Sequence, residues 1–276
     1  MDEQVLTPRS IRPAADRTTR TTRLRGSMSP VTRIEDHVPG DGSERLVIPL
    51  GDSITQGQIG ADWVGSLAER YAGDDTAFVN AGVNGNLAWN VLQRLDAVIA
   101  ARPAIVTLLI GTNDVSGARS AEMAALYRQQ QGIPRAPTAD WFEENVAAIL
   151  DRMRFETDAR IALLEIPLAG ERLDEEPNLT VLAYNGILHR LAADRGIEVL
   201  PVFDRLAAVL PAGATPPPFA IDIAQTIQAA TDHARGRSWD EISASNGLSL
   251  LIDQVHLNDR AGGIVADLVA GFLDEA

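Results

Sequence analysis

Short apolar runs alternate with amphipathic segments along most of the chain. The apolar runs predict strands, and segments with apolar residues three or four positions apart predict helices. The predicted strands cover 46–50, 77–79, 105–110, 161–166 and 197–200, and the predicted helices cover 62–71, 87–100, 120–131, 138–155, 178–195, 221–234, 239–245 and 258–275. Strands that alternate with helices favour a parallel sheet with helices on both faces. We therefore predict a three-layer α/β/α sandwich around a central, mostly parallel sheet of five strands.

The first part of the chain has a different composition. Residues 1–33 carry seven arginines and three acidic residues, together with many threonines and few large apolar side chains. Such a segment is typical of disorder. We predict a disordered Arg/Thr-rich arm over 1–44 and a single domain over 45–276. The alternatives for the arm are a basic interaction tail and a native start at Met28.

Composition excludes several classes of function. The formal net charge of −14 argues against binding of nucleic acid or of anionic membranes. The chain has no cysteine and no lysine, which excludes disulfides, thiolate metal sites and Schiff-base chemistry. No apolar run reaches membrane-spanning length, and the N-terminal residues lack the apolar core of a secretion signal. We expect a cytoplasmic protein without stable membrane insertion.

Three turns rich in glycine and asparagine follow successive predicted strands. They are Gly51-Asp52-Ser53, the stretch 80–86, and the stretch 111–114 with the sequence Gly-Thr-Asn-Asp. Each alone is an ordinary turn. In an open parallel sheet, however, the carboxyl ends of the strands lie together and form the ligand site. The three turns are therefore expected to meet at one edge of the sheet.

A fourth element, Asp253-Gln254-Val255-His256, precedes the last predicted helix. A hydroxyl nucleophile needs a base within hydrogen-bond reach, and that base needs an orienting group on its other nitrogen. An aspartate three residues before a histidine can supply this group locally. The other three histidines are less suitable, because His37 lies in the predicted arm and His189 and His233 lie in predicted helices.

The blocks GDSITQG, NAGVNG, GTND and DQVH resemble, in this order, the four signature blocks of the SGNH (GDSL) hydrolase superfamily. The resemblance extends from about Leu46 to the C-terminus. It implies a flavodoxin-like fold and a serine esterase that forms an acyl-enzyme without a metal or an organic cofactor. It further implies the triad Ser53 (nucleophile), His256 (general base) and Asp253 (orienting acid).

The same resemblance implies an oxyanion hole made of the backbone N–H groups of Ser53 and Gly85 and the side-chain amide of Asn113. Gly82 competes with Gly85 for the second position, and Asn86 stands where the family often has aspartate. Pre-aimed donors of this kind stabilise the charge that develops on an ester oxygen, and each is worth roughly 3–4 kcal/mol.

Other residues of these segments have more ordinary expected roles. Asp52 and Asp114 are expected to brace their turns through local hydrogen bonds. The four tryptophans, Trp63, Trp89, Trp141 and Trp239, are candidates for lining an acyl pocket, but ordinary core packing is the preferred interpretation for each. Segments near 116–137 and 213–247 lie beyond the minimal core of the family, and they are expected to cover part of the sheet edge.

The predicted function is hydrolysis of carboxylic ester bonds in small or acylated substrates. The nearest alternative is an acyltransferase, for example for O-acetyl transfer, which uses the same triad and differs only in the acceptor. A non-catalytic carbohydrate- or protein-binding module on the same scaffold is a second alternative. A two-metal phosphoesterase is disfavoured because such sites need several histidine ligands. The sequence leaves open the acyl chain, the alcohol, the choice between ester and thioester, and the oligomeric state.

Overall fold

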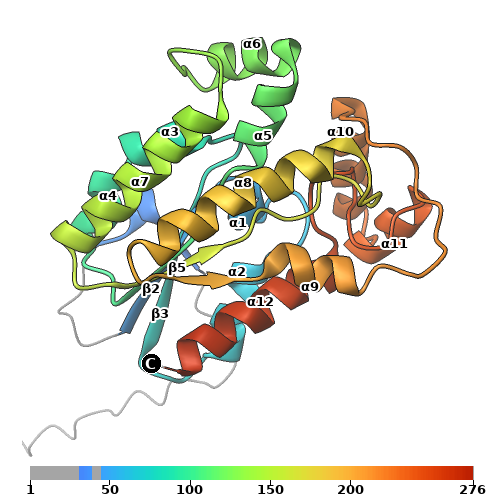
Figure 1. The fold of residues 1–276 in the computed structure, drawn as a ribbon. Helices are drawn as coiled ribbons and strands as arrows, with labels where there is room; N and C mark the ends of the chain where they lie inside the picture. The colour runs from blue at the N-terminus through green and yellow to red at the C-terminus, as the bar shows by residue number, and fades with distance from the viewer. Residues whose placement is uncertain (1–30, 39–44, 276) are drawn as a thin grey trace, which may run out of the picture.

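The fold is built on one parallel sheet covered by helices on both faces (Figure 1). The computed structural model describes residues 31–38 and 45–275. Within these residues the sheet has six strands, in the order β1-β3-β2-β4-β5-β6. The strands are β1 (Thr32–Arg33), β2 (Arg45–Gly51), β3 (Thr76–Gly82), β4 (Ile105–Leu109), β5 (Arg160–Leu164) and β6 (Glu198–Leu200). The predicted α/β/α architecture is confirmed, with one strand more than expected.

The order of the last five strands brings the predicted turns together. Apart from β1, the order β3-β2-β4-β5-β6 is the 2-1-3-4-5 order of flavodoxin-like sheets. Gly51 at the end of β2 pairs with Gly82 of β3 on one side and with Leu109 of β4 on the other. The turns that follow these three strands therefore start at the same level of the sheet, side by side.

The helices are α1 (Ser53–Gln56), α2 (Trp63–Arg70), α3 (Ala88–Gln93), α4 (Leu95–Ala100), α5 (Thr112–Arg119), α6 (Ala121–Gln130), α7 (Ala139–Glu156), α8 (Glu176–Ala193), α9 (Val202–Ala208), α10 (Ile223–Ala234), α11 (Trp239–Ser245) and α12 (Asp259–Asp274), with a short 3-10 turn, η1 (Ile34–Asp36). Helices α3, α4, α7 and α8 cover one face of the sheet, and α2, α9 and α12 cover the other. Helices α5, α6 and α10 lie above the carboxyl ends of the strands (Figure 1). None of the described helices is long and apolar enough to cross a membrane.

The central strands are buried on both faces, which explains why they appear as continuous apolar runs rather than as alternating patterns. In β2, Val47, Ile48 and Leu50 are fully buried, and in β4 all five residues are buried. Each buried side chain of this size contributes about 1.5–3 kcal/mol. The core therefore lies along both faces of the sheet, and it fixes the level at which each strand ends.

The N-terminal half differs from the prediction in several places. Thr112, Asn113 and Asp114, which were predicted as part of a turn, form the first turn of helix α5. Residues 31–38 belong to the segment predicted as a disordered arm, yet β1 pairs with β3 and Ile34 is buried. The other residues of the predicted arm, 1–30 and 39–44, lie outside the described part of the chain. The predicted helix 87–100 is divided into α3 and α4 at Arg94.

The division at Arg94 has a physical reason in the contacts of its side chain. Its guanidinium group donates to the carbonyl oxygen of Gly51 and to Oδ1 of Asn86, both at 2.8 Å. The helix break thus places the guanidinium group of Arg94 against the first two of the turns that follow the strands. These turns lie at the edge of the sheet formed by the carboxyl ends of the strands, which we call the carboxyl edge.

Helix α12 packs closely, through a glycine, against Ala61, which lies two residues before α2. A Cβ atom added at Gly262 would lie 2.3 Å from the Cβ atom of Ala61, whereas a Cβ at the neighbouring Gly263 would meet nothing within 4 Å. Alanine is favoured over glycine inside a helix by about 1 kcal/mol. We expect Gly263→Ala to stabilise the protein by about this amount and Gly262→Ala to destabilise it, both measured by urea unfolding. Equal effects of the two substitutions would contradict this packing.

Candidate active site

Ser53 lies at the first turn after the central strand β2. The preceding residue, Asp52, caps the short helix α1 by accepting a hydrogen bond from the N–H of Ile54 at 3.0 Å. A Cβ atom at Gly51 would approach the carbonyl oxygen of Leu109 to 2.2 Å, so only glycine allows β2 and β4 to come this close. Asp52 and Ser53 are both buried. The backbone therefore holds Ser53 in one place at the carboxyl edge.

His256 and Asp253 lie directly beside this serine. Nε2 of His256 is 3.1 Å from Oγ of Ser53, although the two residues are 203 positions apart. Nδ1 of His256 lies 2.8 Å from Oδ2 and 3.1 Å from Oδ1 of Asp253. Because a carboxylate can only accept, Nδ1 carries the proton and Nε2 is free to accept one from the serine hydroxyl. The three side chains form a continuous hydrogen-bonded row.

The loop that carries Asp253 and His256 contains no helix and is held by side chains from elsewhere. The buried carboxylate of Glu171 accepts hydrogen bonds from the N–H groups of Ser249, Leu250 and Leu251 at 2.7–3.0 Å. The side chain of Asn258 donates to the carbonyl oxygen of Ser249 at 2.9 Å and caps α12. These contacts fix the loop at both of its ends.

Two further contacts hold the middle of the same loop. The carbonyl oxygen of Gln254, whose φ of 71° is in the left-handed region, accepts from the N–H of Gly170 at 2.8 Å. The hydroxyl of Thr226 on α10 donates to Oδ2 of Asp253 at 2.6 Å. Asp253 therefore receives hydrogen bonds from both His256 and the segment 213–247.

The electrostatics of this hydrogen-bonded row favour an ion pair between Asp253 and His256. Burial by itself raises the pKa of Asp253, but the attraction of His256 and the hydrogen bonds from His256 and Thr226 outweigh it and lower the pKa to about 2. Burial lowers the pKa of His256, and the charges of Asp253 and Asp52 together with the hydrogen bond to Asp253 more than compensate, so that its pKa is raised. Asp253 is consequently charged over the whole physiological range.

The third turn places Asn113 beside the first two. Nδ2 of Asn113 donates to the carbonyl oxygen of Asn86 at 2.9 Å and makes a long contact, 3.4 Å, with Oδ2 of Asp52. Oδ1 of Asn113 accepts from the hydroxyl of Tyr127 at 2.8 Å. All four sequence blocks singled out above thus meet at one point of the carboxyl edge.

The two candidate glycines of the second turn have different surroundings. The N–H of Gly82 donates to Oδ1 of Asn80 at 2.8 Å, and a Cβ atom there would lie 2.3 Å from the backbone nitrogen of Gln56. Gly85 has a φ of 73°, and the side chain of Gln131 lies close to its Cα. Because the N–H of Gly82 already has a partner inside the turn, the geometry favours Gly85 as a donor to a ligand.

Two buried acids brace the turns in the expected way. Asp52 caps α1, and Oδ2 of Asp114 accepts from the N–H of Ala88 at 3.0 Å. Burial raises the pKa of Asp52 to about 7 and that of Asp114 to about 8, against the opposing effect of these backbone hydrogen bonds. These acids hold the turns together from inside the protein.

Three of the four tryptophans pack in the interior. Trp63 is buried in the main core and its Nε1 donates to the carbonyl oxygen of Ile54 at 2.9 Å. Trp141 lies in a small cluster with Leu87 and Tyr127, and Trp239 lies in another beside α10. Trp89 is partly buried against the cluster of Trp141. For the three buried tryptophans, core packing is the role that the structure supports.

Four residues whose side chains contact the turns or the loop of the candidate site were not anticipated from the sequence, namely Glu171, Arg94, Thr226 and Tyr127. None of them belongs to a motif, and Thr226 and Tyr127 lie in segments beyond the four blocks. An amphipathic pattern indicates which helix face is buried, but it does not indicate whether a hydroxyl on that face meets a partner. Their contacts therefore follow from tertiary packing alone.

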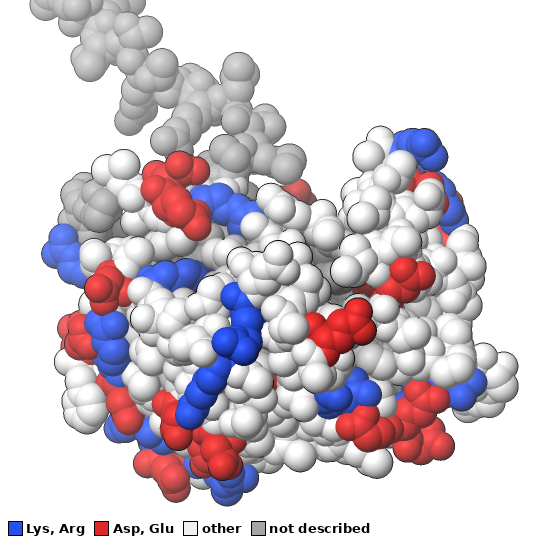
Figure 2. All heavy atoms as spheres, turned by 90° about the horizontal axis from the view of Figure 1, so that it is seen from above, with Lys and Arg blue, Asp and Glu red and all other residues white. Residues whose placement is uncertain are grey.

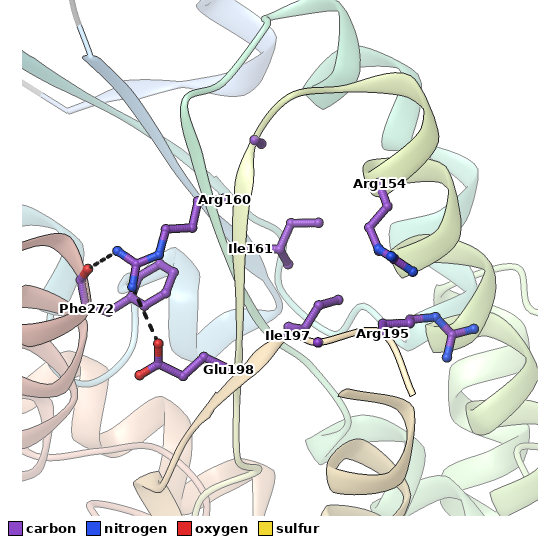
Figure 3. A pocket seen from close by; sticks show the side chains of 9 residues that line it. Arg154, Arg160, Ile161, Arg195, Ile197, Glu198 and Phe272 are labelled. Atoms are coloured by element: carbon purple, nitrogen blue, oxygen red, sulfur yellow. Dashed lines mark hydrogen bonds and ion pairs between the residues drawn. The ribbon is translucent and has the colours of Figure 1, made fainter. Parts of the chain in front are cut away.

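Figure 2 looks down on the carboxyl edge and shows that this face is hollowed between the main body and the part of the chain that carries α10 and α11. A different hollow, of about 300 Å³, lies at the amino-terminal ends of β5 and β6 (Figure 3). Of the residues that line this second hollow, Arg195 donates a hydrogen bond to the carboxylate of Asp151, and Arg160 donates one to the carbonyl oxygen of Phe272. In the described residues, no group of three or more His, Asp or Glu side chains is arranged to hold a metal ion.

Comparison with known proteins identifies the family. The model of the GDSL-like lipase/acylhydrolase family matches residues 50–261, so the chain belongs to this family. The match covers all four blocks that meet at the carboxyl edge. No curated protein sequence gives a significant match.

Solved structures of similar fold include several esterases. The acetyl xylan esterase AlAXEase has a TM-score of 0.57 and 21% identity, over 82% of this chain and 98% of its own. A lipase/acylhydrolase from Enterococcus faecalis has a TM-score of 0.56 and 19% identity, over 83% and 95%. A GDSL-like lipase from Bacteroides thetaiotaomicron has a TM-score of 0.57 and 16% identity, over 88% and 94%. At these identities the similarity establishes the shared fold.

The ion pair between Asp253 and His256 has a measurable consequence. We expect Asp253→Asn to lower the pKa of His256, because it removes the charge and the charged hydrogen bond that raise it. A pH titration of the histidine ring resonances by NMR measures this change. Asp267→Asn, which alters an exposed acid of α12, is the matched control and should leave the titration of His256 unchanged.

The same substitution should also change the pH dependence of stability. Folding raises the pKa of His256, so its contribution is complete below its ordinary pKa and disappears as the pH rises through the raised value. Folding lowers the pKa of Asp253 from 3.8 to about 2, so its contribution is present above pH 3.8 and disappears as the pH falls towards 2. Asp253→Asn should therefore cost more stability at about pH 5 than at about pH 9. An equal loss at the two pH values would contradict the ion pair.

Proposed function

We propose that the protein is a serine hydrolase that cleaves carboxylic ester bonds, with Ser53 as nucleophile, His256 as general base and Asp253 as the residue that orients it. The observation that carries this proposal is the row of hydrogen bonds from Asp253 through His256 to Ser53, at 2.8 and 3.1 Å. A hydroxyl, an imidazole and a carboxylate in this order are the parts that an acyl-transfer nucleophile requires. Membership of the acylhydrolase family supports the same chemistry.

The reaction proceeds through an acyl-enzyme. Oγ of Ser53 attacks the ester carbonyl carbon while Nε2 of His256 takes the hydroxyl proton. The carbonyl oxygen becomes negatively charged, and the N–H groups of Ser53 and Gly85 and Nδ2 of Asn113 donate to it. When the tetrahedral intermediate collapses, the C–O bond to the alcohol breaks and His256 returns the proton to the leaving alcohol. Water, deprotonated by His256 in its turn, then releases the carboxylic acid.

The arrangement also predicts how activity depends on pH. His256 accepts the serine proton only in its neutral form, and Asp253 raises its pKa. Activity should consequently increase as the pH rises through the pKa of His256. Asp253 is buried on the side of the imidazole away from the serine, where it stabilises the imidazolium that forms during attack.

For the substrate we propose an ester of a small or acylated compound. Acetylated xylo-oligosaccharides are the first compounds to test, because structures of similar fold include acetyl xylan esterases. A rate series over p-nitrophenyl esters from acetate to palmitate, with acetylated xylan and an acyl-CoA in parallel, measures the preferred acyl length. Adding a second alcohol and assaying its ester separates hydrolysis from acyl transfer.

Substitution of the nucleophile tests the proposal directly. Ser53→Ala should reduce ester hydrolysis by about 10⁴-fold or more while the circular dichroism spectrum stays unchanged. Ser66→Ala, which removes an exposed hydroxyl of α2, is the matched control and should keep full activity. Turnover that survives in Ser53→Ala would exclude Ser53 as the nucleophile.

Asn113 provides a second, independent test. Asn113→Ala should lower kcat by about 10²- to 10³-fold with little change in KM, because the donor acts on charge that develops in the transition state. Asn145→Ala on α7 removes an amide that bonds within its own helix and serves as a control for loss of a buried asparagine. A large rise in KM with unchanged kcat would mean that Asn113 binds the substrate instead.

A further inference from the structure

Tyr127 lies in the segment 116–137 and contacts the oxyanion side of the proposed site. Its ring is buried in the cluster with Leu87, Ile133 and Trp141, on the inner face of α6. From there its hydroxyl reaches Oδ1 of Asn113 at 2.8 Å. The contact joins a helix beyond the four sequence blocks to the side chain that is proposed to stabilise the transition state.

The orientation of the Asn113 amide follows from its neighbours. The carbonyl oxygen of Asn86, 2.9 Å away, can only accept a hydrogen bond, so the amide group must turn its NH₂ towards Asn86. Oδ1 therefore faces Tyr127, and the tyrosine hydroxyl must be the donor. A flipped amide would lose the hydrogen bond to Asn86, and it would meet the tyrosine hydroxyl as a donor instead of an acceptor.

This orientation leaves one N–H of Asn113 available. The first N–H of the NH₂ group is held by Asn86, and the second has only the long contact of 3.4 Å with Asp52. The second N–H is therefore the one that can donate to a developing oxyanion without any movement of the amide. A flipped amide would present its oxygen there and repel the same charge.

The remainder of the segment 116–137 supports the neighbouring turn. Oε1 of Gln131 accepts from Nδ2 of Asn86 at 3.3 Å, its Nε2 donates to the carbonyl oxygen of Asn84 at 3.4 Å, and its own carbonyl oxygen accepts from Nδ2 of Asn90 at 2.8 Å. Tyr127 and Gln131 lie on one helix and its cap, four residues apart. The two side chains thus hold the second and third turns against each other.

We propose that Tyr127 is a positioning residue that fixes the amide of Asn113 with its N–H directed at the oxyanion; this inference rests on the proposed function. Tyr127 acts through Asn113 and does not touch the reacting atoms. Its hydroxyl remains a donor at all working pH values, because burial, together with the nearby charges of Asp52 and Asp114, raises its pKa well above the usual range.

The test is a double-mutant cycle measured with the best p-nitrophenyl ester. Tyr127→Phe keeps the ring and removes the donor, and it should lower kcat by about two- to tenfold, the equivalent of one net hydrogen bond, with KM nearly unchanged. In the Asn113→Ala background the same substitution should have no further effect on kcat. Tyr71→Phe, whose hydroxyl bonds to Ala270 and Asp274 on α12, is the matched control and should retain kcat.

A purely structural role gives a different result. In that case Tyr127→Phe would lower the urea midpoint without lowering kcat, or would lower kcat equally with and without Asn113, and either result would overturn the proposal. If Ser53→Ala retains full activity, the proposed function itself fails, whereas full activity of Asn113→Ala would overturn only the role given to Asn113 and Tyr127, which distinguishes the two failures.

A spectroscopic measurement covers the case in which Tyr127→Phe does not fold. In protein labelled with 3-fluorotyrosine at its three tyrosines, Asn113→Ala should shift the ¹⁹F resonance of Tyr127 and leave those of Tyr71 and Tyr184 in place. An unmoved Tyr127 resonance would show that the hydroxyl has no functional contact with Asn113.

Discussion

The site depends on one distance constraint: two residues that are 203 positions apart must lie within a single hydrogen bond of each other. Ser53 meets this requirement through the sheet, because β2 is the strand between β3 and β4 and its end is fixed on both sides. His256 belongs to no strand or helix. Its loop is instead tied down by the carboxylate of Glu171, which satisfies three consecutive backbone N–H groups. A buried charged acceptor is suited to this task, since hydrogen bonds to charged groups are the strongest of their kind.

The parts of the site that the sequence predicted share a physical property: their chemistry is local. Asp52 caps the turn that it belongs to, and Asp253 bonds both the ring and the backbone N–H of a residue three positions away. The convergence of the turns follows from a general property of parallel sheets and needs no knowledge of particular contacts. The fold and the grouping of the turns that carry Ser53 and Asn113 could therefore be anticipated from the pattern of the chain, whereas the place of His256 beside them was implied by the resemblance of the four blocks to the family.

The features that escaped prediction depend on contacts between distant segments. Val91, Leu95 and Val98 continue a helical apolar pattern through the break at Arg94, so the pattern predicts one helix where the structure has two. Strand β1 has only two residues and cannot show an alternating pattern. The hydroxyl contacts of Tyr127 and Thr226 arise because α6 and α10 fold back over the carboxyl edge, and a buried tyrosine or threonine gives the same signal in the sequence with or without a partner.

The wide separation of Ser53 and His256 along the chain also has a consequence for synthesis on the ribosome. The serine is made 203 residues before the histidine, an interval on the order of 10–40 s at typical elongation rates. Throughout that interval the nascent chain carries the hydroxyl of Ser53 without the imidazole of His256 that contacts it in the folded protein. Because domains generally fold as units, such a chain gains its row of hydrogen bonds only after α12 has emerged and the last loop has docked. If the proposed function holds, unfinished or truncated chains would contain the first three blocks and still lack esterase activity.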